Sequence, residues 1–344
     1  MKWSGQTCSP PAQCGRTLPR RAVWGLALLL AAVVILSLLI GRYPAPGLLS
    51  PARLLEDRLA QRLVLNLRLP RMLTALLLGM SLSAAGTVFQ MIFANPLVEP
   101  GFLGVSQGAA FGAAFSIIFM SHAAWPVQAS AALFAFLGLG LSYVLARRVR
   151  FGGWVLRLVL AGIAVSAMFS AGLGVLKYVA DPLSQLPEIT FWLLGGLWSV
   201  TWDKLLVILP AVLPGLGVMY AMRWRLNLLA LDDETAFSLG ISPGRERALL
   251  LFASVTATAA VVSVSGMVGW IGLLVPHLAR RLFGADARRS LPASMVIGGL
   301  FALLCDNLAR TLLAGEIPLG ILTSLVGAAL FMALMMTHNV RVQR

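Results

Sequence analysis

One pentapeptide in the chain has the spacing of a serine nucleophile. Gly104-Val105-Ser106-Gln107-Gly108 matches G-x-S-x-G, and His277 is a candidate general base for Ser106. The catalytic form of this motif needs a strand before the serine and a tight turn into a helix after it. Here small residues continue beyond the motif, which suits close helix packing in lipid. We therefore interpret the motif as a packing face and predict no catalytic residue.

The chain lacks the sequence signatures of nucleotide and metal chemistry. No G-x-x-x-x-G-K-[ST] loop is present and none of the lysines follows a glycine, so we predict no P-loop for ATP. The three histidines are widely spaced. The cysteines Cys8, Cys14 and Cys305 form neither a metal pattern nor a disulfide framework. We predict a protein that is not an enzyme and holds no metal and no cofactor.

A short acidic segment between two apolar runs has the residues of a capped helix. Asp232 suits the N-cap position, the two acidic residues after it suit the positive N-terminus, and Gly240 suits a left-handed stop. Exposed apolar side chains on such a helix indicate docking to another protein. The alternative, a helix lying on lipid, is disfavoured because anionic lipids repel its acids. The residues expected at this contact are Asp232, Asp233, Glu234, Thr235, Phe237, Leu239 and Gly240.

Polar side chains within the apolar runs are the remaining candidates for function, because charges at membrane depth are costly and face protein or water. Asp306 and Arg310 are one helical turn apart, so they can pair on one face. The sequence leaves open whether this pair is structural or functional. Gln90, Asn95 and Asn307 either hydrogen-bond between helices or line a pathway.

The composition places the chain in a membrane. Hydrophobic residues make up 59% of the 344 residues and charged residues 12%, and the mean hydropathy is +0.87. A soluble domain carries about twice that share of charge, roughly a quarter, so this chain cannot cover its own surface in water. The net charge of +14 does not indicate a nucleic-acid partner, because the basic residues occupy short gaps between apolar runs. We predict an all-α polytopic membrane protein in contact with the lipid bilayer.

The apolar runs predict about ten transmembrane helices, because a bilayer core needs about 20 apolar residues per helix. The predicted spans are Val23–Ile40, Met72–Phe93, Phe102–Met120, Val127–Ala146, Val155–Tyr178, Leu205–Met222, Ala248–Ser265, Met267–Ala279, Ala293–Leu313 and Pro318–Met336. The eighth is short and contains glycines, so we expect it to be broken or tightly packed. Ile189–Leu197 is too short to span and is predicted to be a half-helix on the outer surface.

The distribution of Lys and Arg orients these spans. With both termini in the cytoplasm, most basic residues fall on the cytoplasmic side, as the positive-inside rule requires. The exception is an outer group of arginines between Arg42 and Arg71. The first apolar run lacks a clear small-x-small cleavage site, so we interpret it as a retained helix rather than a signal peptide. We predict a cytoplasmic tail over 1–21, a single transmembrane domain over 22–338 and a cytoplasmic tail over 339–344.

Several short blocks follow one another in a characteristic order. They are Arg68–Arg71, Gly86–Gln90, Asn95–Pro100, Leu103–Ser106, Phe191–Gly196, Glu234–Ala236, Ser238–Gly240, Gly269–His277, Arg288–Arg289, Asp306 with Leu308–Arg310, and Glu316–Gly320. In this order the blocks resemble the permease subunits of ABC importers for ferric siderophores, haem and cobalamin, the FecCD-like family of type II importers. The resemblance runs from about Arg68 to Phe331. It departs at Ala94, where the family often has arginine or lysine.

The resemblance implies a type II ABC importer permease fold with ten helices per subunit. It implies a homodimer around a central path, two ATPase subunits that bind ATP, and a substrate-binding protein that docks outside. The location implied is the cell membrane of a bacterium or archaeon. The acidic segment, at about 232–240, would be the coupling helix that seats in a cleft of the ATPase.

The resemblance also assigns the outer arginines. Arg68, Arg71 and Arg310 match positions that receive glutamates from the binding protein, through charge-assisted pairs that fix orientation. The turn Phe151–Leu156 and the half-helix Ile189–Leu197 are gate candidates. The residues expected in the translocation path or its gates are Gln90, Asn95, Ser106, Gly153, Trp192 and Asn307.

The expected cargo is a ferric siderophore, moved by alternating access. Cobalamin, haem and molybdate are the alternatives, since relatives carry them by the same mechanism. A secondary transporter is a weaker hypothesis, because it needs intramembrane acids near the midplane and Asp306 alone supplies few. An intramembrane serine protease is weaker still, because it rests on Ser106 with His277, and the small residues around Ser106 suit helix packing instead.

Overall fold

A computed structural model describes residues 20–41, 47–50, 56–120, 123–313 and 315–336. Both predicted tails lie almost wholly outside these residues, as do Cys8 and Cys14. Apart from one short strand pair, the described elements are helical. They are α1 (Arg20–Leu39), β1 (Ile40–Gly41), β2 (Gly47–Leu48), α3 (Arg58–Arg62), the π-helical η1 (Leu63–Arg68), α4 (Leu69–Ile92), the 3-10 turn η2 (Pro100–Leu103), α5 (Val105–Phe119), α6 (Ala124–Arg148), α7 (Trp154–Val179), α8 (Gln185–Leu194), α9 (Trp202–Ala221), α10 (Arg223–Leu229), α11 (Asp233–Ser238), α12 (Pro243–Ser265), α13 (Ile271–Phe283), α14 (Ala287–Thr311) and α15 (Leu319–Met336).

The predicted all-α polytopic fold is confirmed. Seven of the described helices are long and apolar enough to cross a membrane: α4 with its N-terminal extension, α6, α7, α9, α12, α14 and α15. The ten predicted spans coincide with these seven and with α1, α5 and α13. α5 and α13 are shorter, at 15 and 13 residues. A count of about ten membrane passages therefore agrees with the structure.

Several predicted boundaries need correction: the seventh and ninth spans begin at Pro243 and Ala287 rather than at Ala248 and Ala293. The eighth span begins at Ile271 rather than Met267, because Gly266 and Trp270 have positive φ angles of 67° and 71°, which a helix does not admit. The half-helix α8 starts at Gln185 and ends at Leu194, where Gly195 takes a φ of 67°. The second span starts well before Met72, because α3, η1 and α4 form one helical run from Arg58 to Ile92.

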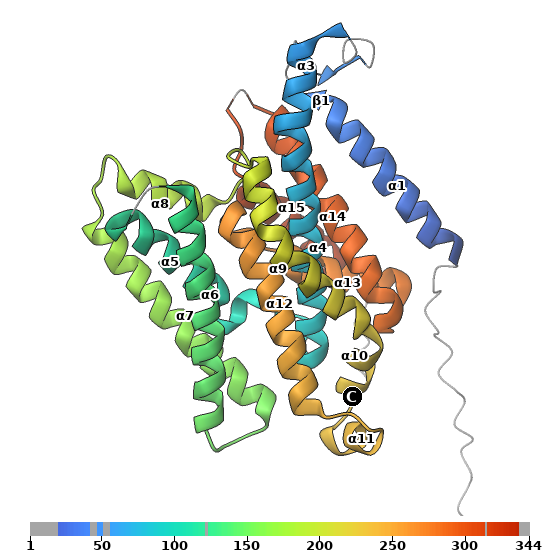
Figure 1. Cartoon of the computed structure of the whole chain (residues 1–344). Coiled ribbons are helices and arrows are strands. Elements are labelled where there is room, and N and C mark those ends of the chain that lie inside the picture. Colours follow the sequence, from blue (N-terminus) through green and yellow to red (C-terminus); the bar gives the residue numbers. More distant parts are fainter. Residues whose placement is uncertain (1–19, 42–46, 51–55, 121–122, 314, 337–344) are drawn as a thin grey trace, which may run out of the picture.

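α4 forms the centre of the larger helix group, with α14, α12 and α13 packed around it (Figure 1). Glycines make this packing close. A Cβ atom on Gly79 would collide with the carbonyl group of Gly298 in α14, and one on Gly86 would collide with that of Gly272 in α13. Small residues let helices approach closely where lipid supplies no hydrophobic driving force. A second group, α5, α6 and α7, lies beside α12 (Figure 1).

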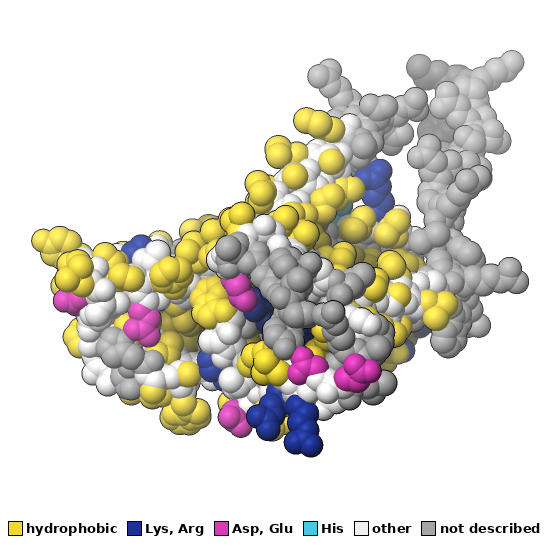
Figure 2. All heavy atoms as spheres, turned by 90° about the horizontal axis from the view of Figure 1, so that it is seen from above, with side chains coloured by type: hydrophobic (Ala, Val, Ile, Leu, Met, Phe, Trp, Pro, Cys, Tyr) yellow, Lys and Arg dark blue, Asp and Glu magenta, His cyan; other side chains and the backbone are white. Residues whose placement is uncertain are grey.

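The molecule has two distinct ends. α3 and β1 lie at one end of the bundle, which we call the α3 end, and α11 lies at the opposite end, the α11 end (Figure 1). Viewed onto the α3 end, hydrophobic side chains form much of the visible surface, and charged side chains are scattered among them (Figure 2). Exposed apolar side chains along helices such as α6, α7 and α15 suit a chain that spans a bilayer.

Candidate functional site

The α3 end holds a cluster of five charged side chains, Arg68, Arg71, Asp306, Arg310 and Glu316, which we call the arginine cluster. Asp306 is 1% exposed and accepts a hydrogen bond of 2.9 Å from Nε of Arg71. The other oxygen of Asp306 lies 3.3 Å from Nε of Arg310, one turn further along α14. The predicted Asp306–Arg310 pair is therefore confirmed. Asp306 also joins α4 to α14, because Arg71 is on α4.

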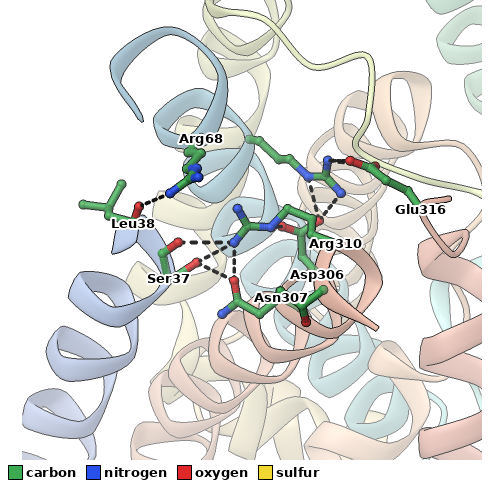
Figure 3. Close-up of polar contacts among 9 residues, drawn as sticks. Ser37, Leu38, Arg68, Asp306, Asn307, Arg310 and Glu316 are labelled. Carbon is green, nitrogen blue, oxygen red and sulfur yellow. Dashed lines mark hydrogen bonds and ion pairs between the residues drawn. The ribbon is translucent and has the colours of Figure 1, made fainter. Parts of the chain in front are cut away.

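Glu316 completes the contacts of Arg71. It lies in the connection from α14 to α15, and both its carboxylate oxygens accept hydrogen bonds of 2.9 Å from Nη1 of Arg71. Its side chain is 39% exposed, whereas that of Arg71 is 11% exposed. Arg68 differs, because its guanidinium donates to the backbone carbonyls of Leu38 and Leu39, at 3.1 and 3.5 Å (Figure 3).

The cluster also holds α1 in place. Ser37, buried in α1, donates to Oδ1 of Asn307 at 2.7 Å. Arg310 donates to the same Asn307 oxygen and to the backbone and side-chain oxygens of Ser37, at 3.3 and 3.2 Å (Figure 3). Asn307, predicted to lie in the path or a gate, is thus part of the arginine cluster's surroundings. Its extra amide links α14 to α1.

A cavity of about 240 Å³ opens beside the arginine cluster. Its lining includes Arg68, Arg71, Arg310, Glu316 and Trp198. Three guanidinium groups therefore border one small space. A carboxylate is the group that such a space suits, because charge-assisted hydrogen bonds to guanidinium are strong and directional.

At the α11 end, the predicted capped helix is confirmed. The Asp232 side chain accepts from the backbone N–H of Thr235 at 3.0 Å and from its hydroxyl at 2.8 Å. Both hydrogen bonds lower the pKa of Asp232, and the bond from the Thr235 hydroxyl has the larger effect. Gly240 takes the left-handed conformation, with φ 82°. Phe237 and Leu239 are 72% and 55% exposed.

Side-chain contacts tie α11 to the bundle, and we call the group that makes them the α11 junction: Asp233, Arg247, Trp154 and Phe93. Arg247 of α12 is buried and lies 2.7 Å from the Asp233 carboxylate. Its guanidinium also lies over the ring of Trp154, 5.7 Å from the centroid, at the start of α7. Trp154 in turn stacks on Phe93 at the end of α4, with 6.3 Å between ring centroids. The α11 junction therefore links α11 to α12, α7 and α4 through side-chain contacts in series.

Two neighbouring cavities share Glu99, Phe102, Met267 and Gly269 in their linings. One, of about 350 Å³, is lined by η2, α5, α7 and α12 and includes Ser106. The other is a groove of about 980 Å³, lined by the end of α8, the 267–273 segment and α15. Glu99, in the connection between α4 and α5, borders both cavities. Burial raises the pKa of Glu99.

The polar contact of Gln90 lies next to these cavities. Its side-chain amide donates to the backbone carbonyl of Leu273 at 3.1 Å, and its oxygen accepts from Arg280. Both partners belong to α13, so Gln90 joins α4 to α13. Of the two alternatives open for Gln90, the interhelical hydrogen bond is the one observed.

The other predicted path residues are dispersed. Trp192 of α8 lines a separate cavity of about 270 Å³ near the α3 end. Asn95 and Gly153 are exposed, and the Asn95 side chain accepts from the backbone N–H of Leu97 at 2.9 Å, which stabilises a local turn. Ser106 stands in the first turn of α5, after a 3-10 turn, so the described residues contain no strand-to-helix elbow at this motif. This agrees with the packing interpretation.

Several residues of these sites had no predicted role, including Arg247 and Phe93 of the α11 junction. Glu316 and Glu99 lie inside blocks that the family resemblance had already marked, so attention to the acids within those blocks would have found them. Ser37 carries no sequence signal, because serine is common within apolar helices.

The sequence model of the FecCD transport family matches residues 28–337. The chain belongs to this family. It is 40% identical to the molybdate import system permease protein of Haemophilus influenzae, over 90% of this chain and 94% of that protein. It is 42% identical to the hemin transport system permease protein of Yersinia pestis, over 80% and 83% of the two chains. An inward-facing structure of a metal-chelate type ABC transporter is 39% identical to this chain, with a TM-score of 0.86. The match covers 93% of this chain and 100% of that one.

These similarities show that this FecCD family member is the permease subunit of an ABC importer and a multi-pass membrane protein. Such a subunit is not itself an enzyme. ATP is hydrolysed by a separate ATPase subunit, and permeases of this kind work with a substrate-binding protein.

Proposed function

We propose that this permease carries a ferric chelate of the siderophore type across the cell membrane by alternating access. The observation that carries the proposal is the groove of about 980 Å³, whose lining is mainly apolar and includes Leu193, Trp270 and Leu325. Such a surface suits a bulky organic chelate, which presents carbon as well as oxygen. Relatives named for iron chelatin, at 42% identity, and for iron(3+)-hydroxamate, at 36%, support this cargo class.

Molybdate is the second candidate, because the molybdate permease matches over more of this chain, 90% against 79% for the iron chelatin permease. The cavity chemistry argues against it. Molybdate is a small dianion, which needs cations or hydrogen-bond donors, whereas Glu99 places a carboxyl group beside both cavities. We therefore favour a chelate without strong negative charge. Haem and cobalamin remain alternatives within the same mechanism.

We propose that α11 is the coupling helix and seats in a cleft of the ATPase. Its exposed Phe237 and Leu239 supply an apolar contact outside the bilayer. The α11 junction then passes the movement of the ATPase to α12, whose residues Thr258 and Val262 line the smaller cavity. The turn Phe151–Leu156, which includes Gly153, contains Trp154 of the α11 junction. This turn is therefore our candidate for the inner gate.

We propose that the arginine cluster receives carboxylates of the substrate-binding protein at the opposite end of the bundle. Arg68 is the member best placed for this contact, because its described partners are backbone carbonyls. Arg71 and Arg310 are already paired with acids inside the chain, so they act with Arg68 as a positive surface. In this orientation the α3 end is extracytoplasmic and both termini are cytoplasmic.

The proposed assembly is a homodimer with a central path in a bacterial or archaeal cell membrane. The groove lined by α15 is open on the single chain, and α15 exposes Ile321, Leu325 and Met332. A second copy facing this groove would enclose the path between two equivalent surfaces.

Cargo is tested by competition. Proteoliposomes that contain the permease, its ATPase and its binding protein are loaded with ATP and offered a labelled ferric hydroxamate chelate together with unlabelled competitor. We expect excess unlabelled ferric chelate to suppress uptake and excess molybdate to leave it unchanged. Suppression by molybdate, together with uptake of labelled molybdate, would replace the ferric chelate with the oxyanion.

A further inference from the structure

The arginine cluster contains more positive than negative side chains. It has three arginines against two acids: Arg71 pairs with Asp306 and Glu316, Arg310 pairs with Asp306, and Arg68 borders the same cavity. Asp306 is buried and shared between two arginines, so it belongs to the fixed structure of the bundle. Glu316 is different, because its side chain is 39% exposed and comes from a connection rather than a helix. Glu316 is therefore the acid in the cluster that can leave without opening the helix packing.

Glu316 occupies the same small space that an incoming carboxylate would enter. The cavity of about 240 Å³ is bordered by Glu316 and by the three arginines together. Both Glu316 oxygens already bind Nη1 of Arg71 (Figure 3). A second carboxylate that enters this cavity finds Nη1 of Arg71 already bonded to Glu316. It is also repelled by the negative charge of Glu316. The two acids compete for one guanidinium group.

We propose that Glu316 is a resident competitor for the docking carboxylate, and that docking displaces it from Arg71 and so releases the start of α15. This inference rests on the proposed docking of a substrate-binding protein at the arginine cluster. It adds that the permease holds its own acid in the docking site before the partner arrives. Docking then exchanges one ion pair of Arg71 for another, so the stability of the helix bundle changes little.

The position of Glu316 gives the exchange a mechanical consequence. The next residue, Ile317, donates its backbone N–H to Ala309 at 3.2 Å, and Leu319 donates to Gly195 at 2.8 Å. Gly320 is so close to the carbonyl groups of Leu194 and Met267 that a Cβ atom there would collide with both. The connection therefore holds α15 against the end of α8 and the 266–270 segment.

The same short stretch reaches the proposed path. Gly320, Ile321 and Ser324 of α15 line the groove of about 980 Å³. Only a few residues separate them from Glu316. When Glu316 leaves Arg71, the connection loses its ion pair to α4, which loosens the start of α15, while the Leu319–Gly195 hydrogen bond remains. Docking at the surface is in this way transmitted to the groove.

The proposal predicts that removing the charge of Glu316 strengthens docking. We would measure the affinity of the substrate-binding protein for the permease–ATPase complex in lipid nanodiscs, with Glu316→Gln and with Asp203→Asn as the matched control. Asp203 is an exposed acid in the first turn of α9 at the same end, outside the arginine cluster. We expect Glu316→Gln to tighten binding roughly fivefold, the effect of one nearby charge in a water-like medium. We expect Asp203→Asn to change it much less. Unchanged or weaker binding with Glu316→Gln would overturn the proposal.

A second measurement needs no mutation. Backbone amide hydrogen exchange of the wild-type complex is followed with and without bound partner. We expect docking to speed exchange at Ile317, because displacement of Glu316 loosens the connection. Simple shielding by the partner would slow it, so slower or unchanged exchange would contradict the release.

The variant Arg68→Glu separates this proposal from the function on which it rests. If Arg68→Glu leaves docking unchanged, the arginine cluster is not the docking surface and both proposals fail. If Arg68→Glu abolishes docking while Glu316→Gln fails to tighten it, the docking surface stands and only the resident competitor is wrong.

Discussion

The guanidinium group of Arg71 donates a hydrogen bond of 2.9 Å to the carboxylate of Asp306, although 235 positions separate the two residues in the chain. Because Asp306 also pairs with Arg310, one buried carboxylate joins α4 and α14 at the α3 end. Two of the three arginines assigned to docking by family resemblance are therefore also structural. This explains why they can form a fixed positive surface.

Loss of the Asp306 charge is expected to destabilise the bundle. Asp306→Asn keeps the shape of the side chain but leaves Arg71 and Arg310 facing each other without their shared acid. Breaking a buried pair in this way costs about 3–5 kcal/mol. Thermal unfolding in detergent measures it, with Glu316→Gln as the control, for which a partly exposed pair predicts a loss of at most about 1 kcal/mol. Equal melting temperatures for Asp306→Asn and wild type would show that the ion pairs do not hold the helices together.

Replacement of Arg247 is expected to uncouple ATP hydrolysis from transport. Arg247→Met keeps the apolar stem in α12 but removes the contact with Asp233 and the charge over Trp154. We expect the transported cargo per ATP hydrolysed to fall roughly fivefold, within the range of couplings carried by packed networks. The matched control is Arg245→Met, which removes an exposed arginine of the same helix. If both variants transport as wild type does, movement of α11 is not transmitted through the junction.

The cap of α11 predicts that ATPase binding is independent of Asp232 titration near neutral pH. Hydrogen bonds from Thr235 lower the pKa of Asp232, so its contribution is complete above the unfolded value of 3.8 and is lost as the pH falls through the folded value. ATPase affinity should therefore not depend on Asp232 titration between pH 6 and pH 8. Asp232→Asn, which can still cap, should bind as wild type does, and Asp232→Ala roughly threefold more weakly. Pull-down titrations at both pH values measure this, and equal affinity of the two variants would contradict it.

Close packing of α4 on α14 predicts a selective cost for alanine. At Gly298 a Cβ atom would meet the Ser83 side chain and the carbonyl group of Gly79. We expect Gly298→Ala to destabilise the protein by about 1–3 kcal/mol, as overpacking does. In Gly217→Ala on the exposed side of α9, a Cβ atom meets no neighbour, so that control should be neutral or stabilising. A neutral Gly298→Ala would mean that the two helices can separate without loss.

Much of the fold was predictable because its signals are local. Apolar runs of bilayer length predict helices such as α6 and α12 almost directly. The cap of α11 follows from Asp232 and Gly240, which act within a few residues of their own positions. The Asp306–Arg310 pair follows from its spacing of one helical turn.

The rest depends on contacts between distant segments. No periodicity pairs Arg71 with Asp306 or Ser37 with Asn307, because helix packing alone brings them together. The role of Glu316 was hidden for the same reason, since its partner lies on α4. The break before α13 depends on Trp270 at a φ of 71°. A tryptophan in that conformation is held by its packing against α15, where its ring lies 6.1 Å from that of Phe331, and no local signal predicts it.

The central claim is that ATP hydrolysis by a partner drives a ferric chelate through this permease. The most direct test is uptake of labelled ferric chelate into proteoliposomes that contain permease, ATPase and binding protein, with ATP, without ATP, and with an imposed ion gradient alone. We predict accumulation with ATP only, and loss of that accumulation in Arg68→Glu. Accumulation driven by the ion gradient in the absence of ATP would contradict the mechanism.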